Sequence, residues 1–194
     1  AININDPTVV SAVTQISSQF SPGIGVAFDG VVSNNNLFLA WNASDVGGAI
    51  RATSIDSSLV QNTIIDYATY EADYISVCAD TSSNNVIVYV TFFKALGTVK
   101  TLSFTSSLLS NFAPTTISPS PGVVNIASCA KDGVCTIFLE FTNTPNEIYK
   151  GSITSAGIAT TAATMNKGVG LASKPFIYND VIYILTTFDS NYQP

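Results

Sequence analysis

A sequence unit of about fifty residues recurs along this chain, and it limits the folds that the chain can adopt. An apolar run of strand length marks each copy, at Leu37–Trp41, Ile87–Phe92, Ile137–Phe141 and Ile182–Thr186. A further segment precedes the first three of these runs, at Gly25–Asp29, Ser76–Asp80 and Ala127–Lys131. Self-similarity at such a period is typical of solenoids, propellers and repeat arrays.

Each copy contains four short runs with strand character. In the first copy we expect strands near Ile24–Asp29, Leu37–Asn42, Ala49–Ile55 and Thr63–Asp66. Val, Ile, Phe, Tyr and Thr dominate these runs, and Asn, Gly, Ser and Asp separate them. No segment keeps a helical apolar period beyond about two turns, so no long helix is expected. The pattern predicts an all-β fold, a β-propeller of about four four-stranded blades.

The repeat also predicts where the blades lie. The chain has 194 residues, 46% of them hydrophobic, which is enough for one buried core and a single domain over 1–194. We expect blades at roughly 21–70, 71–120 and 121–166, with a fourth that combines 167–194 with 1–20. A last blade shared between N- and C-terminal strands would leave no open sheet edge. Two alternatives remain: strands exchanged between chains, which builds oligomers or fibres, and four blades of a larger propeller.

The charge of the chain excludes several kinds of partner. Only 10% of the residues are charged, against about 25% in ordinary soluble domains, and the formal net charge is −6. The few scattered lysines and the single arginine argue against nucleic acid and against anionic membrane surfaces. No apolar run approaches the ~18 residues of a spanning helix, so we expect no membrane insertion. A polar but nearly uncharged surface favours an extracellular or cell-surface location.

The absence of histidine from the sequence restricts catalysis. It excludes Ser-His-Asp and Cys-His mechanisms and the usual zinc sites. Glycoside hydrolysis needs only two carboxylates. Glu140 is the catalytic candidate, because it stands inside a strand where the other repeats have the uncharged residues Ala40, Thr91 and Thr186, and a carboxylate there could be partly buried. The simpler interpretation, which we favour, is that Glu140 is a structural carboxylate.

Four aspartates suggest a calcium site. Asp29 and Asp80 end strands that the repeat makes equivalent, and Asp132 and Asp180 lie close to the corresponding turns. A ring of carboxylates on one face would offer the oxygen ligands that calcium prefers. Lys131 at the aligned position of the third repeat argues against such a ring, and solvated turn aspartates are common. Calcium is the one cofactor that the sequence leaves open, and we expect no other.

The cysteines and one asparagine are candidates for modification. Cys129 and Cys135 flank a turn sequence and could form a disulfide across a hairpin. The equally good alternative is that they and Cys78 are small buried hydrophobic residues. Asn42 begins an Asn-Ala-Ser glycosylation signal, which we expect on a turn after a strand.

Over Leu39–Asn42 and Ala49–Asp56 the chain resembles sialidase-like propellers with Asp-box repeats, also called bacterial neuraminidase repeats. The box of that family, Ser-x-Asp-x-Gly-x-Thr-Trp, is degenerate here: Ser54–Val60 keeps the Ser and the Asp but lacks the Gly and the aromatic residue. In the family the box braces a turn between strands, so the resemblance implies a fold and carries no activity. Sialidases clamp a sugar carboxylate with three arginines, and Arg51 is the sole arginine, which excludes a sialidase.

These observations predict a non-catalytic extracellular propeller. It would be a structural or assembly module, such as a subunit of a surface appendage or filament, or else a glycan-binding module. Its partners would be further copies of itself, a cell-surface protein or glycans. The alternative is a secreted carbohydrate-active hydrolase that uses carboxylates.

Overall fold

The computed structural model describes residues 2–3, 6–10, 27–43, 48–58, 60–82, 85–94, 97–118, 122–141, 144–167, 169–171 and 174–188. All of the regular structure in these ranges is β, in antiparallel sheets of two or four strands. Within the same ranges we find no helix with the length and hydropathy of a membrane span. The all-β class predicted from the repeat is confirmed.

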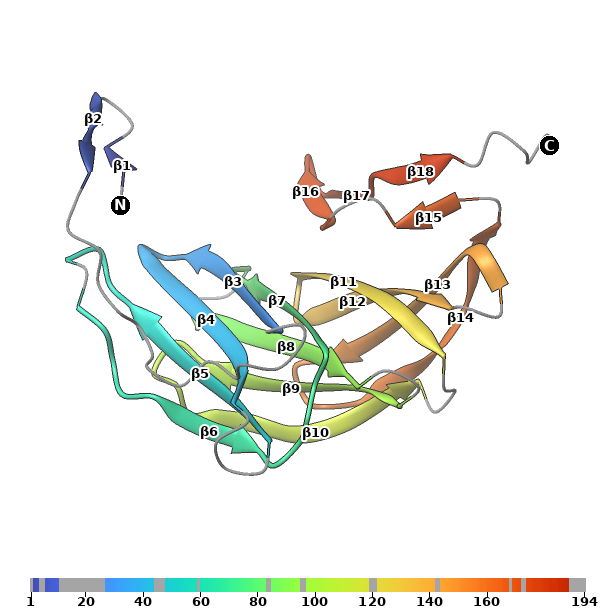
Figure 1. The fold of residues 1–194 in the computed structure, drawn as a ribbon, viewed down its shortest axis with the longest axis horizontal. Helices are drawn as coiled ribbons and strands as arrows, with labels where there is room; N and C mark the ends of the chain where they lie inside the picture. The colour runs from blue at the N-terminus through green and yellow to red at the C-terminus, as the bar shows by residue number, and fades with distance from the viewer. Residues whose placement is uncertain are drawn as a thin grey trace.

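Three four-stranded sheets form the body of the molecule (Figure 1). The first comprises β3 Phe28–Ser33, β4 Asn36–Ala43, β5 Ala49–Ile55 and β6 Ile65–Ala68. The second comprises β7 Tyr74–Asp80, β8 Ile87–Phe93, β9 Val99–Thr105 and β10 Ser110–Ser118. The third comprises β11 Val123–Lys131, β12 Val134–Phe141, β13 Thr144–Thr154 and β14 Ala159–Lys167. Each sheet is an antiparallel meander in chain order, which is the four-stranded blade of a β-propeller.

The first strand of each blade lies beside the first strand of the next. β7 of the second blade is packed between β3 and β11 of its two neighbours. The outer strand β10 likewise contacts β6 and β14 (Figure 1). Neighbouring blades of a propeller pack in this way, so the first strands define the inner side of the molecule.

Tight hairpin turns connect the first two strands of several repeats. Both central residues have positive φ in the turns at Asn34-Asn35, Asp132-Gly133 and Asn179-Asp180. Two-residue turns of this type match the twist of the flanking strands and require residues that tolerate positive φ, mainly Asn, Asp and Gly. The polar turn residues in the sequence therefore explain where the strands reverse.

The turn between the third and fourth strands is the same in all three blades. A backbone N–H at the end of the third strand, or one residue beyond it, donates to the carbonyl four residues on, at Asp56–Val60, Thr105–Leu109 and Thr154–Ile158, over 2.9 to 3.1 Å. The Asp56 carboxylate also accepts the N–H groups of Ser58 and Val60, at 2.8 and 3.0 Å. Asp56 thus braces the turn between β5 and β6.

Apolar side chains fill the spaces between blades. Phe38 and Ile50 of the first blade pack with Phe92 and Phe104 of the second, all at 0% exposure. Burial of one such side chain stabilises the fold by about 1.5–3 kcal/mol. Trp41 is also buried, at 2% exposure, so it belongs to the core as well.

The C-terminal strands begin a further unit. β15 Val169–Leu171 pairs with β18 Thr186–Phe188, and β16 Phe176–Tyr178 pairs with β17 Val181–Tyr183, so the four strands fold back as one interrupted hairpin. At the other end of the chain, β1 Ile2–Asn3 pairs with β2 Asp6–Val10 and lies apart from this hairpin (Figure 1). The shared fourth blade, the blade count and the single domain therefore stay predictions.

Candidate functional site

Strand pairing identifies which first-strand residues are equivalent in the four repeats. The second-strand positions Ala40, Thr91, Glu140 and Thr186 are equivalent in the sequence, and each faces one first-strand residue. Their partners are Asp29, Ser76, Asn125 and Leu171, respectively. These four partners therefore stand at one level on the inner side of successive repeats.

All four partners line one pocket of about 300 Å³. We call it the axial pocket and define it by Phe28, Asp29, Ile75, Ser76, Asn125, Ile126, Ala127, Leu171 and Lys174. Its volume is at the small end of the range for ligand sites, roughly 300–1,000 Å³. Apolar walls with a few polar groups pointing inward are also typical of such sites.

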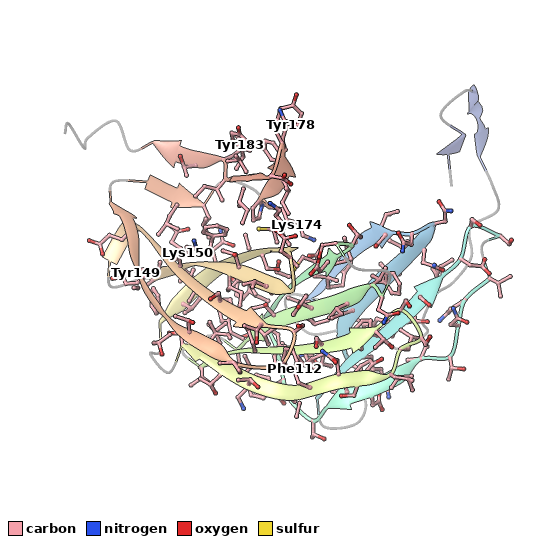
Figure 2. The ribbon with its side chains drawn as sticks, turned by 180° about the vertical axis from the view of Figure 1, so that it is seen from behind. Phe112, Tyr149, Lys150, Lys174, Tyr178 and Tyr183 are labelled. Atoms are coloured by element: carbon pink, nitrogen blue, oxygen red, sulfur yellow. The ribbon has the colours of Figure 1, made fainter. Side chains whose placement is uncertain are left out.

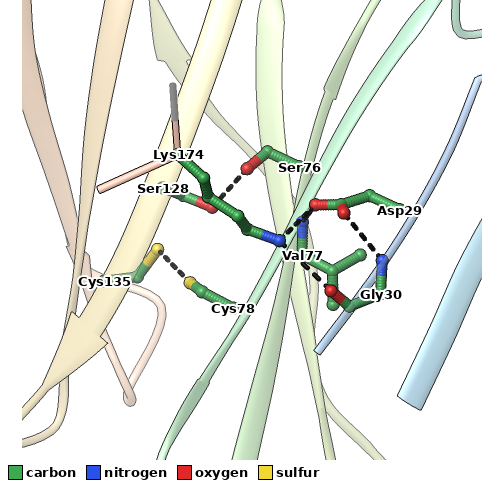
Figure 3. Close-up of polar contacts among 8 residues, drawn as sticks. All are labelled: Asp29, Gly30, Ser76, Val77, Cys78, Ser128, Cys135 and Lys174. Atoms are coloured by element: carbon green, nitrogen blue, oxygen red, sulfur yellow. Dashed lines mark hydrogen bonds and ion pairs between the residues drawn. The ribbon is translucent and has the colours of Figure 1, made fainter. Parts of the chain in front are cut away.

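Among the lining residues that the structure describes, Asp29 carries the one carboxylate, and hydrogen bonds hold it in place (Figure 3). Its Oδ2 accepts hydrogen bonds from the backbone N–H of Val77 at 2.7 Å and from Lys174 Nζ at 2.5 Å. Its Oδ1 accepts from the backbone N–H of Gly30 at 2.8 Å. The two charged side chains are 27% and 39% exposed, so the ion pair offsets the aspartate charge while both groups remain within reach of a ligand.

The equivalent positions of the next repeats carry neutral polar groups. Ser76 Oγ lies 2.8 Å from Ser128 Oγ on the neighbouring blade (Figure 3). Asn125 Nδ2 donates to the Leu171 carbonyl at 3.4 Å. A hydroxyl and an amide can each donate and accept, so they suit a ligand that also carries hydroxyl groups.

Phe28 supplies an aromatic surface at the edge of the pocket. It is 65% exposed, although it stands in a strand, opposite the buried Trp41. An exposed aromatic ring beside inward-pointing polar groups is a common arrangement in small-ligand sites.

Glu140, the catalytic candidate from the sequence, lies on β12 of the third blade. It pairs with Asn125 in the sheet but does not belong to the lining of the axial pocket. Its Oε2 accepts a hydrogen bond from the backbone N–H of Leu171 at 3.3 Å. Glu140 and Asn125 thus both hold the backbone of Leu171, which attaches the C-terminal hairpin to the third blade.

The predicted equivalence of Asp29 and Asp80 is wrong. Asp29 is the second residue of β3, whereas Asp80 is the last residue of β7, at the opposite end of its strand. Asp80 is 4% exposed, and its carboxylate accepts the backbone N–H groups of Ser82 at 2.9 Å and Gly133 at 2.5 Å. Burial raises the pKa of Asp80, but hydrogen bonds from Ser82, Gly133 and Asp132 outweigh it and hold the pKa below its usual range.

The other two aspartates of the predicted calcium ring, Asp132 and Asp180, both contact a lysine. Lys131 Nζ contacts Asp132 Oδ2 at 3.4 Å and Asp180 Oδ1 at 3.2 Å, so its ammonium group stands between the two turns. In the ranges that the structure describes, no three acidic or other ligating side chains come together in a group that could hold a metal. The four aspartates therefore do not assemble into the ring that the sequence suggested.

The predicted disulfide between Cys129 and Cys135 does not fit the register of its hairpin. Cys129 pairs with Thr136 and Cys135 pairs with Ala130, so the two side chains leave opposite faces of the third blade. All three cysteines are buried. Cys78, from the second blade, is the neighbour that faces Cys135.

Asn42 lies within β4 rather than on a turn after it. Its Nδ2 donates to the Ala72 carbonyl at 2.7 Å, and its Oδ1 is buried. Because glycan attachment takes place at this nitrogen, the folded chain does not present Asn42 as an acceptor. Glycosylation at Asn42 stays a prediction that this geometry disfavours.

The sequence analysis missed Phe28, Ser76, Asn125 and Lys174 as neighbours of Asp29. The signal for two of them was present, because Ser76 and Asn125 pair with Thr91 and Glu140, whose equivalence the repeat had shown. Aligning the first strands by their aspartates concealed this relation.

Comparison with known proteins gives only distant similarities. No family model and no curated protein matches the chain. Among solved structures, the catalytic domain of a Coprinopsis cinerea GH62 α-L-arabinofuranosidase superposes with a TM-score of 0.48 and 8% identity, over 90% of this chain and 66% of that one. An α-L-arabinofuranosidase from Podospora anserina, in complex with cellotriose, gives 0.48 and 10%, over 86% and 64%.

A Bacillus subtilis arabinanase gives a TM-score of 0.47 and 16% identity, over 84% of this chain and 68% of that one. This chain thus spans slightly less than two thirds of the first two structures. All three TM-scores lie below 0.5, which is too distant to transfer an activity or a site.

Proposed function

We propose that the chain is a non-catalytic, extracellular glycan-binding propeller whose ligand site is the axial pocket. The observation that carries this proposal is the ion pair of Asp29 with the ammonium group of Lys174 at 2.5 Å, the two charged groups among the described residues that line the pocket. Their charges cancel. A lining in which these residues offer carboxylate, amide, hydroxyl and ammonium groups without net charge suits a neutral ligand with many hydroxyls.

The same lining argues against glycoside hydrolysis. Retaining and inverting glycosidases position two carboxylates, about 5–9.5 Å apart, on either side of the scissile bond. At the positions equivalent to Asp29, the next repeats have Ser76 and Asn125, which do not ionise. Glu140, which pairs with Asn125 in the sheet, does not line the pocket itself, and its Oε2 accepts a hydrogen bond from the backbone N–H of the lining residue Leu171.

A sugar would bind with its ring against Phe28 and its hydroxyls toward Asp29, Asn125 and Lys174. In this geometry the aromatic ring covers the apolar face of the sugar, and the polar groups select the positions of its hydroxyls. The small volume suits one or two sugar units at the end of a longer glycan.

The test is a glycan array that includes plant, fungal and animal oligosaccharides, followed by calorimetric titration of the strongest ligand. We expect wild-type binding that Phe28→Ala weakens at least tenfold, without change in the melting temperature. Tyr74→Ala is a matched control, because Tyr74 is a 44% exposed aromatic residue of β7 that does not line the pocket. Equal loss of binding in both variants, or release of sugar products by the wild type, would overturn the proposal.

One observation favours the second candidate function, an assembly module. The hairpin of β16 and β17 exposes Tyr178 and Tyr183 (Figure 2), and also Phe176 and Val181, at 43–62%. Neighbouring exposed apolar residues mark interaction surfaces more often than isolated ones do. Light scattering over a dilution series separates the functions: growth above the 20.4 kDa of one chain, abolished by Val181→Lys, would support assembly.

A further inference from the structure

Two thiols face each other between the second and third blades. Cys78 of β7 and Cys135 of β12 have their Sγ atoms 3.6 Å apart, although 57 positions separate them in the sequence (Figure 3). They are 5% and 0% exposed, respectively. They belong to one apolar cluster, with Tyr89, Val99 and Ile137.

Hydrogen bonds around the thiols fix the two blades relative to each other. Ser76 and Ser128 join through their hydroxyls at 2.8 Å, close to Cys78 along β7. Beyond the thiols, the hairpin turn at Gly133 accepts a bond from Tyr89 Oη at 3.4 Å and donates one to Asp80. Hydrogen bonds thus join the two blades on both sides of the sulfur pair.

We propose that Cys78 and Cys135 form a disulfide that links the second and third blades. Bond formation requires the sulfur atoms to approach by only about 1.5 Å, since a disulfide bond is roughly 2.05 Å long. Rotation about the side-chain torsions supplies such a movement without displacing the strands. The side chain of Cys129 lies on the face of the third blade opposite to that of Cys135, and it packs in a different apolar cluster. Cys129 therefore remains a thiol.

The oxidant is a disulfide, either oxidised glutathione or the active-site disulfide of a thiol oxidoreductase. One cysteine thiolate attacks it to give a mixed disulfide and one released thiol. The second cysteine then attacks the mixed disulfide and releases the other thiol. The chain loses two hydrogen atoms in total, and the oxidant gains them.

Burial determines when this exchange takes place. The thiolate is the attacking form, and burial holds the pKa of the Cys135 thiol well above its usual range. Exchange is therefore slow once the blades have closed. The bond forms while the third blade docks on the second, and it then resists reduction in the folded protein.

The test is a thiol map of the 194-residue chain refolded with a mixture of oxidised and reduced glutathione. The protein is denatured, alkylated with iodoacetamide and digested. We expect one alkylated cysteine per chain, Cys129, and a peptide pair joined through Cys78 and Cys135. Because the bridge closes a long loop, its reduction should lower the melting temperature by about 10 °C.

Cys129→Ala is the control, and its peptide map should still show the bridge between Cys78 and Cys135. Three alkylated cysteines in a natively folded chain, or a bridge that includes Cys129, would overturn the proposal. The wild-type map decides between these outcomes even if Cys78→Ser or Cys135→Ser fails to fold.

Discussion

Asp29 and Asp80 stand on the first strands of neighbouring blades, but at opposite ends of those strands and in opposite surroundings. Asp80 is 4% exposed and accepts backbone N–H groups from its own turn and from the next blade. Asp29 is held by one backbone N–H of the next blade and by Lys174, and its side chain is 27% exposed in the axial pocket.

The comparison shows how one residue type serves two purposes on a repeated scaffold. A carboxylate surrounded by N–H donors of two blades holds those blades together. A carboxylate that keeps part of its surface in a pocket retains capacity for further hydrogen bonds. Stability and ligand binding should therefore separate along the first strands, and each prediction below tests this separation.

The largest expected effect is on stability, from Asp80→Asn. An amide has a single acceptor oxygen, so the N–H of Ser82 or Gly133 would face another donor. We expect a loss of about 2 kcal/mol in the free energy of unfolding, measured by urea titration, with glycan binding unchanged. Asp132→Asn, at a 68% exposed side chain of the same region, is the control and should change stability by less than about 0.5 kcal/mol. Equal effects would mean that Asp80 does not join the blades.

Asp29→Asn should give the reverse result. The amide oxygen can still accept from Val77, the bond from the Gly30 N–H is lost at a side chain that is 27% exposed to solvent, and a partly exposed ion pair contributes only about 0–1 kcal/mol to stability, so the total loss should be smaller than for Asp80→Asn. The dissociation constant of the array ligand should rise at least tenfold in calorimetry. Asp66→Asn removes the acidic partner of Arg51, another partly exposed ion pair, and should leave binding intact. Loss of binding in the control variant would contradict the specific role of Asp29 in ligand binding.

The acid stability of the chain should depend on Asp80. Its pKa is lower in the folded state than in the unfolded chain, so the unfolded state binds more protons between the two values. The contribution of Asp80 is therefore complete above the unfolded pKa, near 3.9, and is lost as pH falls through the folded value. Urea titrations at pH 6, 4 and 3 should show a shallower decline for Asp80→Asn than for wild type. Parallel declines would contradict this account of the carboxylate.

The smallest effect is expected for Glu140→Gln. Glutamine keeps an acceptor oxygen for the Leu171 N–H, so stability should change by less than about 0.5 kcal/mol. Neither protein should hydrolyse the array ligand, as followed by chromatography of the released sugars. A wild-type activity that this substitution abolishes would instead establish the carboxylate-dependent hydrolase.

The sequence predicted the blades because their signals are local. Strand-forming runs and turn residues such as Asn34, Asn35 and Gly133 determine where each strand starts and reverses. The pocket depends instead on which residues pair across strands. The first hairpins differ in length, since β3 and β4 are joined by two residues whereas residues 81–86 join β7 and β8. An alignment that matches Asp29 with Asp80 therefore hides the equivalence of Asp29 and Ser76.

Two further features could not be predicted from the sequence, for the same reason. Lys174 reaches Asp29 from the C-terminal hairpin, across 145 positions of the chain. Cys78 meets Cys135 only because the second and third blades pack together. Contacts between blades follow from packing, which the pattern of one repeat does not encode.

The most direct test is a titration of the isotope-labelled chain with the strongest array ligand, followed by amide chemical shifts in NMR spectra. The account predicts shifts centred on the amides of Asp29, Ser76, Asn125 and Lys174, none at Ser82 or Gly133, and sugar signals that stay unchanged over days. Shifts centred at the Asp80 end, or new sugar signals from hydrolysis, would contradict a non-catalytic glycan site in the axial pocket.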